Sequence, residues 1–361
     1  MTRVRLVQKL SRLITGNIIP VVAIFIFVVL FPLSGLPASY LVQELLMCIA
    51  RNSFLILSLL IPIMTGMGLN FGITLGVMAG QIGLIFITDW GIIGISGILL
   101  AMIIGTPIAA ALGMLCGSVL NRAKGHEMLA SYVLVFFANS IYQLVVLYFM
   151  GSVIPLTDPT LVLSRGYGIK NTIDLFGIRS AIDGMIPVKI WNFNVPVATC
   201  LIIAFLCLLI VWFRRTKLGQ DMNAIGQEMA IAESAGIPVN RTRVIAIVIS
   251  TVLACYGQII HLQSIGTIST SSHVLLGMSS ITALLIGGAS VSRAGIGNVF
   301  WGAAVFHLMF IVYPTVCKNL FGDAIIGDYF RNYITYTIIL IALVMHAREK
   351  AIRNPELKDK R

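Results

Sequence analysis

Residues 213–243, FRRTKLGQDMNAIGQEMAIAESAGIPVNRTR, form a polar segment between two apolar runs, residues 195–213 and 244–262. Each run comes close to the roughly 20 residues that a transmembrane helix needs. Between the runs, Gly219–Ala235 is rich in helix-forming residues. Gly236-Ile237-Pro238 is typical of a helix end, with a glycine and a following proline. The stretch predicts two membrane spans joined by a helix outside the bilayer.

The composition of the whole chain indicates the same class of protein. Of its 361 residues, 58% are hydrophobic and 11% are charged, and the mean hydropathy is +0.96. Roughly a quarter of the residues in soluble domains are charged, so this chain has too little charge to cover a large core with polar surface. The net charge of +11 comes from basic residues at the ends and in loops between apolar blocks. That distribution fits cytoplasmic loops and not a nucleic-acid-binding face.

Apolar stretches separated by glycine, proline or charge predict an all-α, polytopic membrane protein with about ten spans. An uncleaved first span is preferred over a signal peptide, because many more spans follow it. Residues 36–52 are expected to lie at the membrane surface as an amphipathic segment, since Glu44 and Arg51 are costly inside lipid. The ten predicted spans are residues 18–34, 53–69, 71–88, 92–113, 129–150, 195–213, 244–262, 276–290, 296–315 and 332–347.

The distribution of basic residues predicts the direction of these spans. With both termini in the cytoplasm, 18 of the 25 Lys and Arg residues fall on the cytoplasmic side, as the positive-inside rule requires. Residues 151–194 then form an extracytoplasmic loop, and residues 214–243 form the longest cytoplasmic one. Five spans precede the outer loop and five follow it, which is compatible with a 5+5 inverted repeat. We expect residues 1–361 to form a single transmembrane domain.

The cytoplasmic loop resembles a known motif. Its pattern matches the coupling loop of ABC-importer permeases of the ribose and simple-sugar group, which are relatives of the branched-chain amino-acid permeases. Glu228 stands where that family usually has asparagine, and Ile231 replaces an alanine. The residues that match the family pattern are Thr216, Gly219, Ala224, Gly226, Ala230, Gly236 and Ile237.

Two further stretches resemble the same family, in the same order along the chain. LLIGGASVSRAGIGNVFWGAAV, residues 284–305, is similar to its glycine-rich span pair, in which glycine allows helices or a tight turn to approach closely. TGMGLNFGITLGVMAGQIG, residues 65–83, resembles a broken, glycine-rich segment of the family, with Asn70 where sugar permeases commonly carry aspartate. Irregular backbone at membrane depth often lines a solute pathway.

The resemblance implies partners and a mechanism. Two permease copies, or one copy and a homologue, would sit on two ATP-binding subunits that hold ATP and Mg²⁺. An extracytoplasmic solute-binding protein would deliver the solute to this complex in the bacterial cytoplasmic (inner) membrane. We expect residues 220–237 to receive the force from the ATPase. The candidate coupling residues are Gly226, Glu228, Ala230, Glu233, Gly236 and Ile237.

Polar residues within the spans are candidates for lining the solute path. Asn139 and Gln143 stand four apart and so share one helix face. Such groups often bond only to a neighbouring helix, and this alternative stays open for each of them. The Gly76/Gly80 and Gly113/Gly117 pairs are interpreted as packing faces. The candidate path residues are Asn70, Thr74, Gln81, Asn139, Gln143, His261 and Gln263.

Several kinds of chemistry have no motif in this chain. The sequence contains no Gly-Lys pair and hence no Walker loop, so we expect it to bind no cofactor itself. Its six cysteines form no C-x-x-C pair, and no acid–base constellation of an enzyme is evident. The predicted function is a permease subunit for a small neutral polar solute: a sugar or nucleoside first, and a branched-chain amino acid next. A stand-alone secondary transporter is the alternative, but its coupling-ion site would need intramembrane Asp, Glu or His, which are scarce here.

Overall fold

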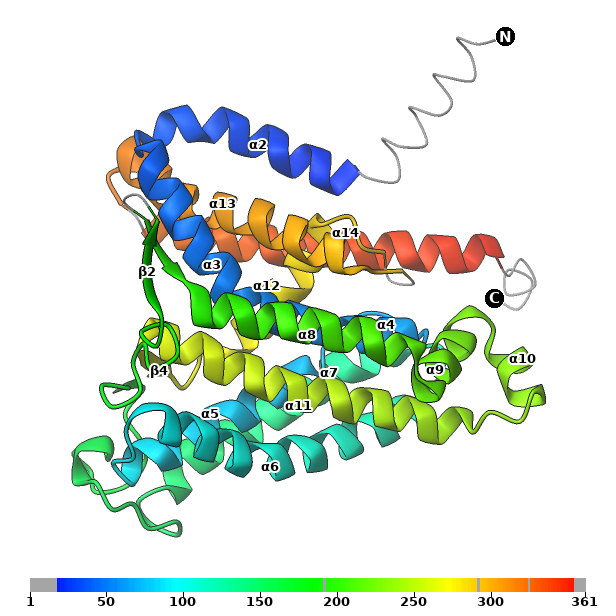
Figure 1. Ribbon diagram of the computed structural model, residues 1–361, viewed down its shortest axis with the longest axis horizontal. Helices are drawn as coiled ribbons and strands as arrows, with labels where there is room; N and C mark the ends of the chain where they lie inside the picture. Colours follow the sequence, from blue (N-terminus) through cyan, green and yellow to red (C-terminus); the bar gives the residue numbers. More distant parts are fainter. Residues whose placement is uncertain (1–17, 191–192, 291–292, 324, 354–361) are drawn as a thin grey trace. The chain divides into compact units, whose positions relative to one another are not determined.

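The computed structural model describes residues 18–190, 193–290, 293–323 and 325–353, and these residues are mostly helical (Figure 1). The helices are α2 (Ile18–Ser34), α3 (Ala38–Ser58), α4 (Leu60–Met64), α5 (Ile73–Asp89), α6 (Gly94–Arg122), α7 (Glu127–Leu144), the π-helical turn η1 (Val145–Phe149), the 3₁₀ turn η2 (Pro159–Leu161), α8 (Val197–Arg215), α9 (Lys217–Gln227), α10 (Met229–Ser234), α11 (Val239–Ile265), α12 (His273–Ile286), α13 (Ile296–Phe321) and α14 (Ile325–Arg353). Four short strands accompany them: β1 (Thr172–Asp174), β2 (Pro187–Ile190), β3 (Phe193–Pro196) and β4 (Thr267–Ser269).

The chain divides into two compact units, of which the larger is Ala50–Met278. Its core is α11, packed between α5 and α6, and Figure 1 shows α6 and α11 side by side over much of their length. A Cβ added at Gly80 would lie 2.7 Å from the Cys255 carbonyl oxygen, and one at Gly113 would lie 3.0 Å from Val248 Cα. These contacts bring the helix backbones together, because no side chain separates them at the glycines.

The predicted glycine packing faces are confirmed by this geometry. Gly76 repeats the contact one turn before Gly80, against the carbonyl oxygen of Thr251. Gly117 repeats it one turn after Gly113, with a Cβ position 3.0 Å from Val244 Cα. The two glycine pairs therefore fix α5 and α6 on α11.

The second unit contains the described residues up to Ile49 and those from Ser279 onward. Within it α2 packs on α13, where Asn319 Nδ2 donates to the Ser34 carbonyl oxygen at 3.0 Å. The glycine-rich motif joins α12 to α13: Gly302 abuts the Ala283 carbonyl oxygen, and Gly287 abuts that of Asn298. The motif is thus a close helix–helix contact, as its glycines predict.

The structure supports only some of the ten predicted spans. Within the described residues, six helical segments are long and apolar enough to cross a membrane, and three more apolar helices are shorter. The six are Ala38–Met64, Gly94–Arg122, Glu127–Phe149, Val197–Arg215, Val239–Ile265 and Ile296–Phe321, and the three are Pro20–Ser34, Ile73–Asp89 and His273–Ile286. A polytopic membrane protein follows from these helices, whereas the count of ten, the side of the termini and the inverted repeat stay predictions.

The separate surface segment predicted at residues 36–52 is wrong. Helix α3 begins at Ala38 and runs unbroken to Ser58, so it joins that segment to the start of the following predicted span. Glu44 and Arg51 lie within this unbroken helix, and both are half-buried and have interactions in the structure.

The strands are a departure from the all-α expectation. β2 pairs with β3 as an antiparallel hairpin before α8, and β1 pairs with β4, which follows α11. In the second pair Ile173 lies opposite Ile268, and both side chains are buried. The predicted outer loop, residues 151–194, is therefore tied to the end of α11. This end lies opposite the end that carries α9 and α10 (Figure 1).

Candidate functional site

Residues 216–238, the coupling segment, form two short helices and not the single helix predicted over 219–235. Thr216 caps α9 by accepting a hydrogen bond from Gly219 N at 3.3 Å. Glu228 then adopts an extended backbone, φ −153° and ψ 106°, and α10 begins after it. The break changes the direction of the chain so that Ala232 of α10 packs back on Ile225 of α9. Packing within the segment therefore overrides the local preference for one continuous helix.

The inner face of the coupling segment is fixed on the larger unit. Met222 of α9 is fully buried against Ile61 of α4 and Ala246 of α11. Ile225 and Ala232 form a second buried cluster with Val239 at the start of α11. A displacement of α9 or α10 would thus be transmitted to α4 and α11, because close-packed apolar side chains resist separation.

The outer face of the coupling segment is open. Ala230 and Glu233 are exposed, as is Glu228 at the break. Ile231 is 67% exposed, although it is a large apolar residue. Gly236 ends α10 at φ +82°, a left-handed conformation that glycine adopts without strain. In Figure 1 α10 extends beyond the end of α11.

Two of the six predicted coupling residues have inward contacts. A Cβ on Gly226 would overlap the Met64 carbonyl oxygen, so this glycine allows α9 to lie directly on the turn after α4. Ile237 is half-buried and packs on the cluster around Ile225. The other four candidates, Glu228, Ala230, Glu233 and Gly236, lie on the exposed side.

Three of the predicted path residues meet in one hydrogen-bonded cluster at the segment between β4 and α12. Gln81 Nε2 donates to the Ser269 carbonyl oxygen at 3.0 Å, and Gln143 Nε2 donates to that of Thr270 at 3.1 Å. Asn139 Oδ1 lies 2.9 Å from His273 Nε2. Helices α5 and α7 are thereby both hydrogen-bonded to the chain between α11 and α12.

The other path candidates lie elsewhere. Asn70 and Thr74 are buried at the start of α5, and neither Asn70 Nδ2 nor Thr74 Oγ1 has a hydrogen-bond partner within the described residues. Gln263 accepts a bond from Ile182 N at 3.3 Å and so holds the outer loop. His261 is nearly buried on the same stretch of α11. The seven candidates thus fall into a cluster of three, a pair at the start of α5 and a pair near the end of α11.

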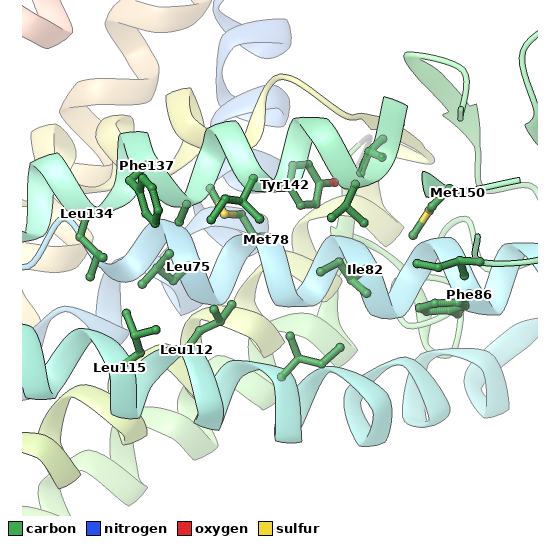
Figure 2. Close-up of a pocket in the computed structure, with 16 residues that line it drawn as sticks. Leu75, Met78, Ile82, Phe86, Leu112, Leu115, Leu134, Phe137, Tyr142 and Met150 are labelled. Carbon is green, nitrogen blue, oxygen red and sulfur yellow. The ribbon is translucent and has the colours of Figure 1, made fainter. Parts of the chain in front are cut away.

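An apolar cavity of about 390 Å³ lies between α5, α6 and α7. Figure 2 shows side chains from these helices pointing into it, among them Met78, Leu112 and Phe137. The hydroxyl group of Tyr142 on its wall donates to Gln81 Oε1 at 2.9 Å. Because the rest of the lining offers almost no polar group, the cavity is unsuited to a sugar or another polar solute.

Four residues were missed by sequence reasoning. Tyr142 and His273 belong to the polar cluster, where their rings meet edge to face at 4.7 Å between centroids. Tyr142 lies three residues after Asn139 on one helix face, which was a usable signal. Arg243 and Glu127 form a buried ion pair. Arg243 falls in the apolar spacing of α11, four residues after Val239 and three before Ala246, which predicts an inward side chain.

Comparison with known proteins bears on this architecture. Over 246 residues the chain is 25% identical to the autoinducer 2 import system permease protein LsrD of Photorhabdus luminescens, covering 68% of this chain and 65% of that protein. It is 25% identical over 201 residues to the fructose import permease protein FruG of Bifidobacterium longum, covering 55% and 54%. It is 29% identical over 147 residues to the autoinducer 2 import system permease protein LsrC of an Enterobacter species, covering 40% and 41%.

The matched regions thus span between about two fifths and two thirds of the relatives' own lengths. No solved structure matches the chain. The family model described as branched-chain amino acid transport system / permease component matches residues 40–345. That match takes in the coupling segment, the polar cluster and the glycine-rich contact of α12 with α13. The chain therefore belongs to the branched-chain amino acid transport system / permease component family.

Proposed function

We propose that the chain is the membrane-spanning subunit of an ATP-binding-cassette importer in the bacterial inner membrane. Its partners would be two ATP-binding subunits, a second permease and an extracytoplasmic solute-binding protein. The observation that carries the proposal is the two-sided construction of the coupling segment. Its inner face is buried on α4 and α11, and its outer face exposes Ala230, Ile231 and Glu233.

This construction is suited to passing on force. An exposed apolar residue such as Ile231 is favourable once a partner covers it, since its burial removes apolar surface from water. Small neighbours such as Ala230 and Ala235 leave room for a groove of the partner to close around the helix. When the ATP-binding subunits close on ATP, they would displace α9 and α10, and the buried contacts would move α4 and α11 with them.

The polar cluster supports an uncharged polar solute. Its side chains are amides, a phenol and an imidazole, which exchange hydrogen bonds without carrying a fixed charge. Relatives named for fructose and autoinducer 2 import favour a sugar or a sugar-like molecule as the first candidate. A nucleoside is the second candidate and a branched-chain amino acid the third.

A stand-alone secondary transporter is distinguished by reconstitution. The chain is placed in vesicles alone or with its candidate ATP-binding subunits, and uphill uptake of fructose, ribose and adenosine is measured with solute-binding protein present. We expect accumulation only with both ATP and the ATP-binding subunits. Accumulation by the chain alone would overturn the proposal.

The coupling segment is tested with Ala230→Arg, which adds a long charged side chain to the exposed face. Ala230→Ser is the matched control, since it keeps the small side chain at the same position. We expect Ala230→Arg to insert normally but to lose co-purification with the ATP-binding subunits and stimulation of their ATPase. Normal stimulation in this variant would contradict docking at α10.

A further inference from the structure

Arg243 is buried where three helices meet at the end of the unit that carries the coupling segment. It is the fifth residue of α11, and its side chain is 0% exposed. Among the described residues it is also the largest fully buried side chain. A guanidinium group stays charged under all ordinary conditions, so its burial requires a partner of opposite charge or a set of hydrogen-bond acceptors.

That partner is Glu127, the first residue of α7. Glu127 Oε1 lies 2.5 Å from Arg243 Nη2, and the Glu127 side chain is only 13% exposed. The second carboxylate oxygen, Oε2, accepts a hydrogen bond from Gly125 N at 2.8 Å. A carboxylate at this position also faces the positive end of the α7 dipole. Glu127 is thus fixed to the start of α7 and bonded to α11 at the same time.

A second contact of Arg243 reaches the coupling segment. Arg243 Nη1 lies 4.0 Å from Met229 Sδ, and Met229 is the first residue of α10 after the break at Glu228. A hydrogen bond also joins α6 to α11 nearby: Asn121 Nδ2 at the end of α6 donates to the Asn240 carbonyl oxygen at 2.7 Å. Arg243 therefore contacts the coupling segment on one side and α7 on the other.

Helix α7 leads from this ion pair to the proposed solute path. One turn after Glu127, Ser131 Oγ accepts a hydrogen bond from Phe71 N at 3.3 Å, next to Asn70. Farther along the same helix lie Asn139 and Gln143 of the polar cluster, 12 and 16 residues from Glu127. At about 1.5 Å of rise per residue, α7 spans roughly 18–24 Å between the ion pair and the cluster.

We propose that the Arg243–Glu127 ion pair links the coupling segment to α7, so that the force received at α10 repositions the helix that carries Asn139 and Gln143. The inference rests on the proposed function and adds a specific route to it. An apolar cluster packs α10 on α9 and on the start of α11. The ion pair connects α7 to α9, α10 and α11. Its surroundings have a low dielectric constant, which strengthens the attraction between the two charges. Arg243 and Glu127 are positioning residues, since neither belongs to the polar cluster.

The test is hydrogen exchange of the permease assembled with its ATP-binding subunits, with and without trapping by ATP and vanadate. Trapping needs no transported solute, so the experiment does not depend on its identity. The variant is Glu127→Gln, which removes the charge and places an amide beside Arg243. The matched control is Asp328→Asn, the same change in the half-exposed Asp328–Arg331 ion pair of α14.

Exchange in two segments separates the two proposals. Trapping is expected to slow exchange in α9–α10 of every variant, which reports docking. In the parent and in Asp328→Asn it should also change exchange across residues 127–143 by at least about 5-fold, a typical size for coupling between sites. In Glu127→Gln the change in residues 127–143 should fall below about 2-fold while that in α9–α10 persists.

The outcomes that overturn the link are equally distinct. If α7 responds in Glu127→Gln as it does in the parent, the ion pair is not the route. If α9–α10 shows no protection in the parent, the proposed docking itself fails. Should Glu127→Gln not fold, Glu127→Gln/Arg243→Gln carries the test, because it leaves no lone buried charge. An α7 response in the double variant, or failure of both variants to fold, would overturn the link in favour of a purely structural ion pair.

Discussion

Gly226→Ala is the substitution that most directly tests how the coupling segment is fixed. The added methyl group would overlap the Met64 carbonyl oxygen and lie 3.1 Å from Gly66 N. The facing residue, Gly66, is itself a glycine with φ +70°, so backbone meets backbone at this contact. A backbone cannot swing aside as a flexible side chain can, and α9 must therefore shift away from the turn after α4.

The magnitude follows from a comparison with Gly297→Ala in α13. A methyl group at Gly297 meets no atom within 4 Å. Both changes replace a glycine near a helix end, so both gain a similar helix propensity of up to about 1 kcal/mol. The difference between them isolates the overpacking at Gly226, which costs about 1–3 kcal/mol. Each kcal/mol shifts the unfolding temperature of a unit of roughly 150–250 residues by about 2–4 °C.

The assay is thermal unfolding of the purified permease, followed by the loss of the monodisperse fraction. We expect Gly226→Ala to unfold roughly 2–12 °C below Gly297→Ala, from the overpacking cost and the shift per kcal/mol together. In the assembled complex it should also weaken the stimulation of the ATPase, because the displaced α9 no longer rests on α4. Equal unfolding temperatures for the two variants would refute the close backbone contact at Gly226. They would also refute the conclusion that α9 is held rigidly against the turn after α4.

Three other substitutions test the helix contacts and the polar groups. Tyr142→Phe should destabilise the fold by about 1–3 kcal/mol, because Gln81 Oε1 loses its buried donor; unchanged thermal unfolding would contradict this. Gly113→Leu should abolish recovery of monodisperse protein, because α6 cannot then approach Val248; normal yield would count against the contact. Asn70→Leu should reduce solute uptake more than assembly of the complex, and unchanged uptake kinetics would remove Asn70 from the path.

Much of the membrane architecture could be predicted from the sequence, because apolar length and glycine spacing are local signals. The first predicted span, residues 18–34, ends where α2 ends, at Ser34. The Gly76/Gly80 and Gly113/Gly117 pairs were correctly interpreted as packing faces. In both cases the information lies within one helix, where hydropathy and the spacing of small residues report what the helix faces.

Features that depend on distant partners could not be predicted. β1 and β4 are about 95 residues apart in the chain, and each is too short for its own sequence pattern to predict a strand. The break at Glu228 occurs among good helix formers, because Ala232 gains a buried site against Ile225 and Val239. Tertiary packing overrides propensity in such places.

The polar residues show the same limit. Asn139 was singled out from its place on a helix, yet its neighbour His273 lies 134 residues later in the chain. Arg243 was assigned to a cytoplasmic loop by its charge, and its burial depends on Glu127, 116 residues earlier. A basic residue at the edge of an apolar run has the same local pattern whether it faces water or a buried carboxylate.

The glycine contacts of α11 constrain how this permease can move during a transport cycle. At Gly76, Gly80, Gly113 and Gly117 the backbones of α5 and α6 contact α11 directly, because these glycines have no side chain to separate the helices. Sliding either helix by one residue would push a bulkier neighbour against a carbonyl group, so shear along these interfaces is blocked. The three helices must travel as one solid body. Under the proposed function, the opening for the solute would then form at the margins of this rigid body and not through its middle.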